Sequence, residues 1–239
     1  MENSIYIGLS RQIALQTNMD IVANNIANMN TSGFRGQNPV FEEYISNPTN
    51  GDDPLSFVSD YGQYQMSDPG PLRQTGNELD VALVGDGFIS VQMPDGGTGY
   101  TRDGSFHLRS DGTLVTSSDM PVMGDGGIIV LPTDSAHISI DENGVISDND
   151  GPVSKLGVVE FANIQTLEPA GHNAYTCPES GVEPKNTTVS QGFIEGSNVK
   201  PVTEMTRMIE IMRNFQSTQN ILKSEHDRMR EAVQKLTQM

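Results

Sequence analysis

Residues 22–34 have the sequence Val-Ala-Asn-Asn-Ile-Ala-Asn-Met-Asn-Thr-Ser-Gly-Phe, so four asparagines stand at the end of an apolar pattern that stops at Gly33. The pattern upstream alternates gaps of four and three residues, which is the spacing of a coiled-coil seam. Its members are Leu15, Met19, Val22, Ile26 and Met29. Because glycine adopts the left-handed backbone that closes a helix, we predict an amphipathic helix over residues 4–29.

The asparagines Asn24, Asn25 and Asn28 are poor helix formers, because their amides also hydrogen-bond to the backbone of non-helical chain. A helix that contains them forms readily where neighbouring groups pack against it and bond to those amides. Two interpretations remain open. The amides form a polar contact surface between subunits, which is our working hypothesis, or they lie on a solvated face near the helix end.

The C-terminal segment, residues 201–239, carries a longer repeat with the same alternation of three and four residues. Its members are Met205, Met208, Met212, Phe215, Gln219, Leu222, His226, Met229, Val233 and Leu236. Pro201 suits the first helical turn, where its missing N–H costs nothing. The repeat predicts a helix from about residue 201 to 237, roughly 55 Å long at 1.5 Å per residue.

Between the two helices the period of the pattern changes to two, as in half-buried strands. Apolar residues alternate with other types from Leu79 to Leu83 and again from Ile89 to Met93. Pairs such as Asp-Gly and Asn-Gly, which favour hairpin turns, follow at short intervals. These features predict a compact antiparallel β-domain over residues 79–168.

Two stretches rich in turn-forming residues flank this domain. Residues 35–78 hold five prolines among Asn, Gly, Asp and Ser, a composition typical of extended connectors without regular elements. The prediction is therefore an α+β fold in which a β-domain is inserted between two terminal helices. Its segments are an N-terminal helical segment (1–34), a connector (35–78), the β-domain (79–168), a return connector (169–200) and a C-terminal helix (201–239).

The composition excludes several classes of function. With 31 acidic and 14 basic residues the formal net charge is −17, which disfavours nucleic acid and anionic membranes, because phosphate binding needs clustered Lys and Arg. One cysteine, Cys177, allows no internal disulfide. The first 30 residues lack the pattern of a signal peptide, and no apolar run of 18 residues occurs. We expect neither a cleaved signal nor membrane insertion.

Catalytic patterns are also missing from the sequence. The four histidines are scattered without paired-ligand spacing, and neither a nucleophile elbow nor a phosphate-binding loop occurs. We therefore expect no catalytic residues, no cofactor and no metal site.

The two helices should pack together, since each carries an apolar face outside the β-domain. They carry more apolar surface than a single pair can cover, so we expect neighbouring subunits to complete the burial. The predicted interface residues are Leu15, Met19, Val22, Asn24, Asn25, Ile26, Asn28, Met205, Met208, Met212, Phe215 and Leu222. In the isolated protein we expect weak hydrogen-exchange protection in residues 1–30 and 201–239.

Three blocks of sequence resemble the bacterial flagellar rod and hook family, and together they cover almost the whole chain. They are residues 23–28 with 31–35 (ANNIAN, TSGFR), residues 79–88 with 100–106 and 112–116 (LDVALVGDGF, YTRDGSF, GTLVT), and residues 191–199 with 204–209 (QGFIEGSNV, EMTRMI). Within the family the N-terminal helix and the modest length most resemble the proximal-rod members. Distal-rod and hook-family members are the alternative. Residues 212–216, Met-Arg-Asn-Phe-Gln, depart from the usual Gln-Arg-Ala-Tyr-Glu.

The resemblance implies a structural subunit of the basal-body rod, the drive shaft that crosses the periplasm. It implies export through the flagellar type III apparatus without signal cleavage, followed by assembly with copies of itself and other rod proteins. An alternative from another class is a β-rich extracellular binding module or hydrolase that its helices dimerise. A truncation that retains residues 75–170 discriminates the two, since it should bind ligand or turn over substrate only in the second case.

Overall fold

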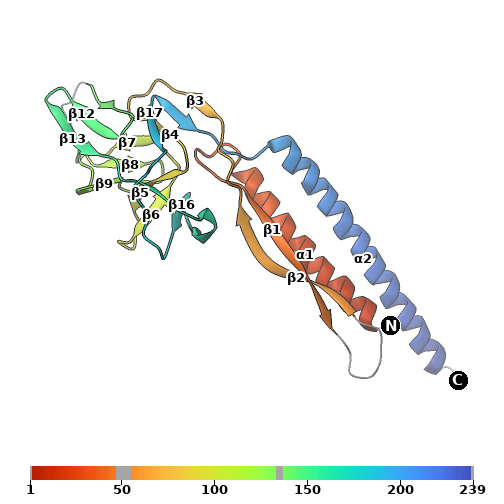
Figure 1. Ribbon diagram of the computed structural model, residues 1–239. Coiled ribbons are helices and arrows are strands. Elements are labelled where there is room, and N and C mark those ends of the chain that lie inside the picture. Colours follow the sequence, from red (N-terminus) through yellow and green to blue (C-terminus); the bar gives the residue numbers. More distant parts are fainter. Residues whose placement is uncertain (1, 47–54, 133–136, 238–239) are drawn as a thin grey trace. The chain divides into compact units, whose positions relative to one another are not determined.

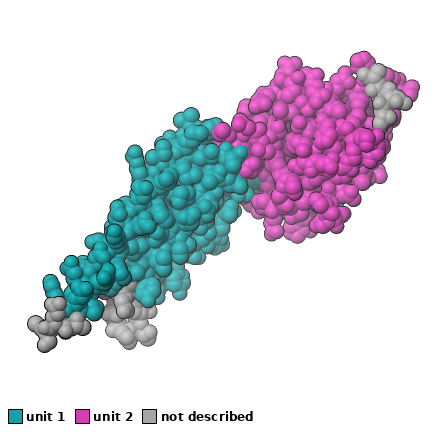
Figure 2. Space-filling view, turned by 180° about the vertical axis from the view of Figure 1, so that it is seen from behind, with its two compact units in different colours: residues 1–27, 37–66, 200–239 teal, residues 28–36, 67–199 magenta. Residues whose placement is uncertain are grey.

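A computed structural model of the chain describes residues 2–46, 55–132 and 137–237, which form two compact units. Unit 1 comprises residues 1–27, 37–66 and 200–239, and unit 2 comprises residues 28–36 and 67–199 (Figure 2). The chain therefore passes between the units four times, after residues 27, 36, 66 and 199. Unit 1 contains both terminal helices, and unit 2 contains most of the strands.

Unit 1 is built from two helices and one hairpin. Helix α1 (Glu2–Ala27) packs against helix α2 (Pro201–Thr237) and also against strands β1 (Gln37–Ser46) and β2 (Leu55–Gln65). Figure 1 shows α1 between α2 and the hairpin. Gly8 lies against Leu222, and the Asn25 amide lies 3.4 Å from the Glu204 carboxylate. The residue number thus rises along α1 in the direction in which it falls along α2, so the two helices are antiparallel.

The β1–β2 hairpin corrects the prediction that residues 35–78 lack regular elements. The strands pair over ten register positions, with Val40 opposite Gly62 and Phe41 opposite Asp60, so that Tyr61 is an extra, bulged residue. Gly62 has φ of +144°, a backbone conformation that side chains rarely permit. Pro39 lies in β1 and Gly62 in β2, and both residue types are tolerated in a two-stranded pair, where each strand has an open edge.

Unit 2 is formed by antiparallel strands in several small sheets. The largest has the order β14-β5-β6-β16-β15, and a three-stranded sheet has the order β11-β12-β13. The remaining pairs are β17-β4, β18-β3, β7-β8 and β10-β9. The strands up to β10 are β3 (Leu72–Gln74), β4 (Val81–Val84), β5 (Gly87–Gln92), β6 (Thr98–Thr101), β7 (Phe106–Leu108), β8 (Leu114–Thr116), β9 (Met123–Gly124) and β10 (Gly127–Ile128). The others are β11 (Ser139–Ile140), β12 (Val145–Asp148), β13 (Gly151–Lys155), β14 (Val158–Glu160), β15 (Glu168–Gly171), β16 (Ala174–Thr176), β17 (Thr188–Gln191) and β18 (Phe193–Glu195), with a short 3₁₀ helix at Ile164–Thr166.

The return connector predicted for residues 169–200 is also corrected. Strands β15 to β18 lie in this range, and β17 and β18 pair with β4 and β3 from the start of the unit. The polar residues that suggested a connector form tight turns instead. His172 and Asn173, for example, have φ of +53° and +58° in the turn that joins β15 to β16.

The main core lies inside unit 2. A cluster of fully buried aliphatic side chains joins strands from several sheets and includes Val81, Ile89, Leu114, Val122 and Ile146. A second cluster is aromatic, with Phe88 and Tyr100 both edge-on to the Phe161 ring. The predicted fold class is confirmed, because two packed terminal helices flank an inserted set of antiparallel sheets.

Candidate subunit interface

The face that α2 turns toward α1 agrees only in part with the repeat in its sequence. The inner row is Ile211, Phe215, Thr218 and Leu222, of which Ile211 and Thr218 are buried and the other two half-buried. It keeps Phe215 and Leu222 of the predicted repeat, but Ile211 and Thr218 take the places predicted for Met212 and Gln219. Of the predicted set, Met205 and Met212 are exposed at 47% and 46%. The structure thus brings Met208, Phe215 and Leu222 to the inner side of α2 and leaves the other two predicted residues outside.

The predicted residues of α1 lie mostly on its inner side. Val22 is fully buried at 0%, while Leu15, Met19 and Ile26 are half-buried. Val22 therefore belongs to the interior of unit 1 in a single chain.

Large apolar side chains remain outside on all three parts of unit 1. The α1 stripe, as we name it, consists of Tyr6, Leu9 and Ile13. The α2 stripe consists of Val202, Met205, Ile209 and Met212. The hairpin exposes Val40, Tyr44, Ile45, Val58, Tyr61 and Tyr64. Groups of exposed large apolar side chains are candidates for a binding surface.

The asparagines divide between two environments. The Asn25 side chain is 1% exposed; its amide donates to the Gln37 carbonyl at 2.8 Å and its oxygen accepts from the Gln37 N–H at 3.0 Å. The amide also reaches the Glu204 carboxylate at 3.4 Å, so one side chain joins α1, β1 and α2. In a single chain the hydrogen bonds of Asn25 are therefore made within unit 1. Asn24 is exposed, and Asn28 is half-buried.

Unit 2 contains a buried charged cluster that the sequence reasoning missed. The Glu195 carboxylate lies 3.1 Å from Arg102 Nη1 and 3.6 Å from Arg35 Nη2, and it accepts a hydrogen bond from the Gly70 N–H at 3.0 Å. All three charged side chains are at most 3% exposed. Because buried charge is costly unless it is paired and hydrogen-bonded, Glu195 is the group on which both guanidinium groups depend.

Further contacts fix Arg102 in place. Its Nη2 donates to the Gly85 carbonyl at 2.5 Å, and its guanidinium lies 5.0 Å from the centre of the Phe88 ring. Burial lowers the pKa of Arg102 to about 10, and the neighbouring Glu195 opposes that shift. The group therefore remains a cation at neutral pH.

The same corner of unit 2 ties together the segments next to the passages between units. Arg35 donates to the Ser67 carbonyl, and the Gly33 N–H donates to the Glu195 carbonyl at 2.8 Å. Asn198 accepts from the Gly36 N–H at 2.8 Å and donates to the Asp68 carbonyl at 2.8 Å. The segments of unit 2 next to three of the four passages, those after residues 36, 66 and 199, are therefore hydrogen-bonded to one another.

Three models of flagellar protein families match successive parts of the chain. They are "Flagella basal body rod protein" over residues 5–35, "Flagellar hook protein FlgE/F/G D1 domain" over residues 82–148 and "Flagellar basal body rod FlgEFG protein C-terminal" over residues 190–235. The flagellar basal-body rod protein FlgF of Caulobacter vibrioides is 36% identical over 245 residues, which cover 99% of this chain and 98% of that protein. The chain belongs to the family of flagellar basal-body rod proteins.

Rod proteins of both the FlgF and FlgG types resemble it over their whole length. The FlgG proteins of Buchnera aphidicola, strain APS, and Bacillus subtilis are 33% and 32% identical. The alignments cover 99% of this chain and 99% of the Buchnera protein, and 98% of this chain and 98% of the Bacillus protein. As a member of this family the chain is a structural, non-enzymatic rod component, which sets aside the alternative of a hydrolase.

The buried cluster gathers one residue from each matched part of this rod protein. Arg35 ends the first match, Arg102 lies in the second and Glu195 lies in the third. The sequence carried no periodic signal for this burial, because Arg102 stands between Thr101 and Asp103 and Glu195 is followed by Gly196 and Ser197. Segments distant in sequence thus meet around one carboxylate.

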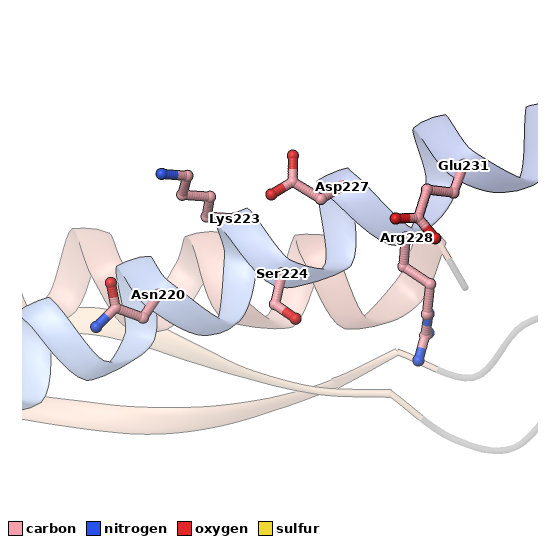
Figure 3. Close-up of a pocket in the computed structure, with 6 residues that line it drawn as sticks. All are labelled: Asn220, Lys223, Ser224, Asp227, Arg228 and Glu231. Atoms are coloured by element: carbon pink, nitrogen blue, oxygen red, sulfur yellow. The ribbon is translucent and has the colours of Figure 1, made fainter. Parts of the chain in front are cut away.

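The described part of α2 bears a hollow on the surface of this rod protein. The hollow is lined by Asn220, Lys223, Ser224, Asp227, Arg228 and Glu231, which all come from one helix and splay outward from it (Figure 3). Within the described residues no cluster of three or more His, Cys, Asp and Glu has the arrangement of a metal site. No described helix is both long and apolar enough to cross a membrane.

Proposed function

We propose that this chain is a subunit of the proximal rod, and that it polymerises through its terminal helices into the helical drive shaft that transmits torque. The single observation that carries the proposal is the apolar surface left outside on unit 1, on the α1 stripe, the α2 stripe and the hairpin. With a net charge of −17, copies of the chain repel one another, so association requires apolar burial of this kind.

The partners in this proposal are copies of the same chain and other rod proteins. Asn24 and Asn28 add polar groups beside the apolar surface, and Met205 and Met212 supply flexible side chains that adapt to non-identical neighbours. A contact between unlike surfaces that does not close on itself generates a helical filament, in which torque passes through many repeated contacts. The subunit would reach the periplasm through the flagellar type III export apparatus without losing a signal peptide.

The substitution Met212→Asp tests the role of the helices. Met212 is half exposed, so a charge there should leave the free energy of unfolding of the purified protein within about 0.5 kcal/mol. In a contact between subunits the same charge would be buried without a partner, and incorporation into rods and motility should be lost. Asn214→Asp, at an exposed polar position on another face of α2, is the matched control. Normal rods with Met212→Asp would refute the proposal.

The position within the rod needs a separate measurement, because relatives include both FlgF and FlgG proteins. Gold labelling or cryo-electron microscopy of basal bodies should place the chain in the proximal rod. Density in the distal rod or hook would contradict the proximal position, but it would leave the structural role of the subunit standing.

A further inference from the structure

The two exposed stripes of unit 1 have matching patterns. Tyr6, Leu9 and Ile13 are separated by three and four residues, which places them on one face of α1. The α2 stripe, residues 202–212, follows the same rule with gaps of three, four and three residues. Each is therefore a row of side chains of the kind that fills the gaps of a complementary row on another helix.

The register of the two helices keeps these stripes apart within one chain. Gly8 lies against Leu222, and Asn25 reaches Glu204. In each pair the two residue numbers sum to about 230, and the same sum tells which α2 residue lies level with any residue of α1. The α1 stripe is then level with about residue 220, whereas the α2 stripe is centred near residue 207. At 1.5 Å per residue the two lie roughly 20 Å apart along the helix axes.

We propose that the α1 stripe of one copy packs against the α2 stripe of a second copy, displaced by about 20 Å along the helix axes. This inference rests on the proposed polymerisation and names the surfaces that meet. In that alignment Leu9 fits between Met205 and Ile209, and Tyr6 fits between Ile209 and Met212. The two stripes differ, so in a pair of copies one copy still has a free α2 stripe and the other a free α1 stripe. The contact therefore repeats from copy to copy and does not close into a dimer.

Charges flanking the stripes favour the same alignment. Asp20 is exposed on the face that carries the α1 stripe, two to four turns beyond its members. The displacement brings Asp20 within about one turn of the start of α2, where Lys200 and the positive end of the helix dipole lie. Within one chain Asp20 is level with about residue 210, some 15 Å away from Lys200 along the axis. The attraction is therefore available only between copies.

A disulfide tests the contact. The chain carrying Leu9→Cys, Ile209→Cys and Cys177→Ser should form disulfide-linked multimers in oxidised basal bodies, since its two new thiols are too far apart to pair within one chain. Mixed chains that each carry one of the two thiols should give dimers and nothing larger. Leu9→Cys with Val233→Cys, an exposed position outside the α2 stripe, is the control and should give no link.

Charge exchange provides a second measurement that does not depend on the thiols. Asp20→Lys and Lys200→Glu should each lower incorporation into rods several-fold, and the two together should restore it. Rods that assemble without the cross-link, or single exchanges that the double variant does not repair, would overturn the staggered contact and leave polymerisation standing. Normal rods with Met212→Asp would instead remove the proposed function on which the contact rests.

Discussion

The two units of the chain bury their side chains to different degrees. Unit 2 encloses a core of fully buried aliphatic residues and even shelters two arginines around Glu195. Unit 1 places its two long helices and one hairpin side by side, and each exposes a row of large apolar side chains. Unit 2 therefore has the interior of an independent folded body, whereas unit 1 has only part of one. The contrast supports the proposal that the helical unit carries the contacts between subunits.

Hydrogen exchange on the purified protein tests this contrast with the largest expected effect. Amides of the buried strands β4, β5 and β8 should exchange at least roughly a hundredfold more slowly than those of α1 and α2, because the helices open locally while the core opens only with the whole unit. Mass spectrometry of peptic fragments measures the difference. Equal strong protection in residues 1–30 and 201–239 of a monomer would remove the argument that the helices require neighbours.

The buried cluster provides the next largest effect, confined to unit 2. Glu195→Ala leaves Arg35 and Arg102 buried without their carboxylate, and should lower the free energy of unfolding by about 3–5 kcal/mol. Urea unfolding followed by circular dichroism measures the change. Glu183→Ala, at an exposed glutamate of the same unit, should change it by less than about 0.5 kcal/mol. Similar values for both variants would mean that the cluster contributes nothing to stability.

A smaller effect is expected in unit 1. Asn25→Ala removes the amide that joins α1, β1 and α2, and leaves the backbone groups of Gln37 unpaired, at a cost of about 1–3 kcal/mol. Exchange should accelerate in α1 and α2 but not in β5. Asn220→Ala, at an exposed asparagine of α2, serves as the matched control. Equal acceleration in both variants would show that the hydrogen bonds of the Asn25 side chain do not stabilise unit 1.

The ends of the helices could be predicted from the sequence, but the face of α2 could not. Periodicity and Pro201 placed α2 correctly at Pro201–Thr237. The helix carries Ile209 and Ile211 in addition to its methionines, so two apolar rows compete for the inner position. The helix that packs against α2 decides which row is buried. Packing against α1 buries the row that contains Ile211 and leaves Met205 exposed.

The hairpin and the charged cluster show two other limits. Aromatic and β-branched residues such as Phe41, Tyr44 and Val58 favoured strands within the predicted connector, but nearby prolines and glycines concealed the signal. The pairing of Arg35 with Glu195 joins segments that are far apart in sequence, and no local pattern specifies which distant charge a buried arginine meets. Tertiary pairing is the information that one sequence lacks.

The division of unit 1 between the two ends of the chain has a consequence for the order of events during synthesis. Asn25 and Glu204 are 179 positions apart in the sequence, so α1 cannot pack against α2 until almost the whole chain has been synthesised. The intervening β unit is complete by then and can fold earlier. A ribosome that stops before residue 201 therefore releases a chain that has a folded middle but cannot close its helix pair. Under the proposed function, a truncated chain of this kind would lack the helix pair through which subunits join the rod.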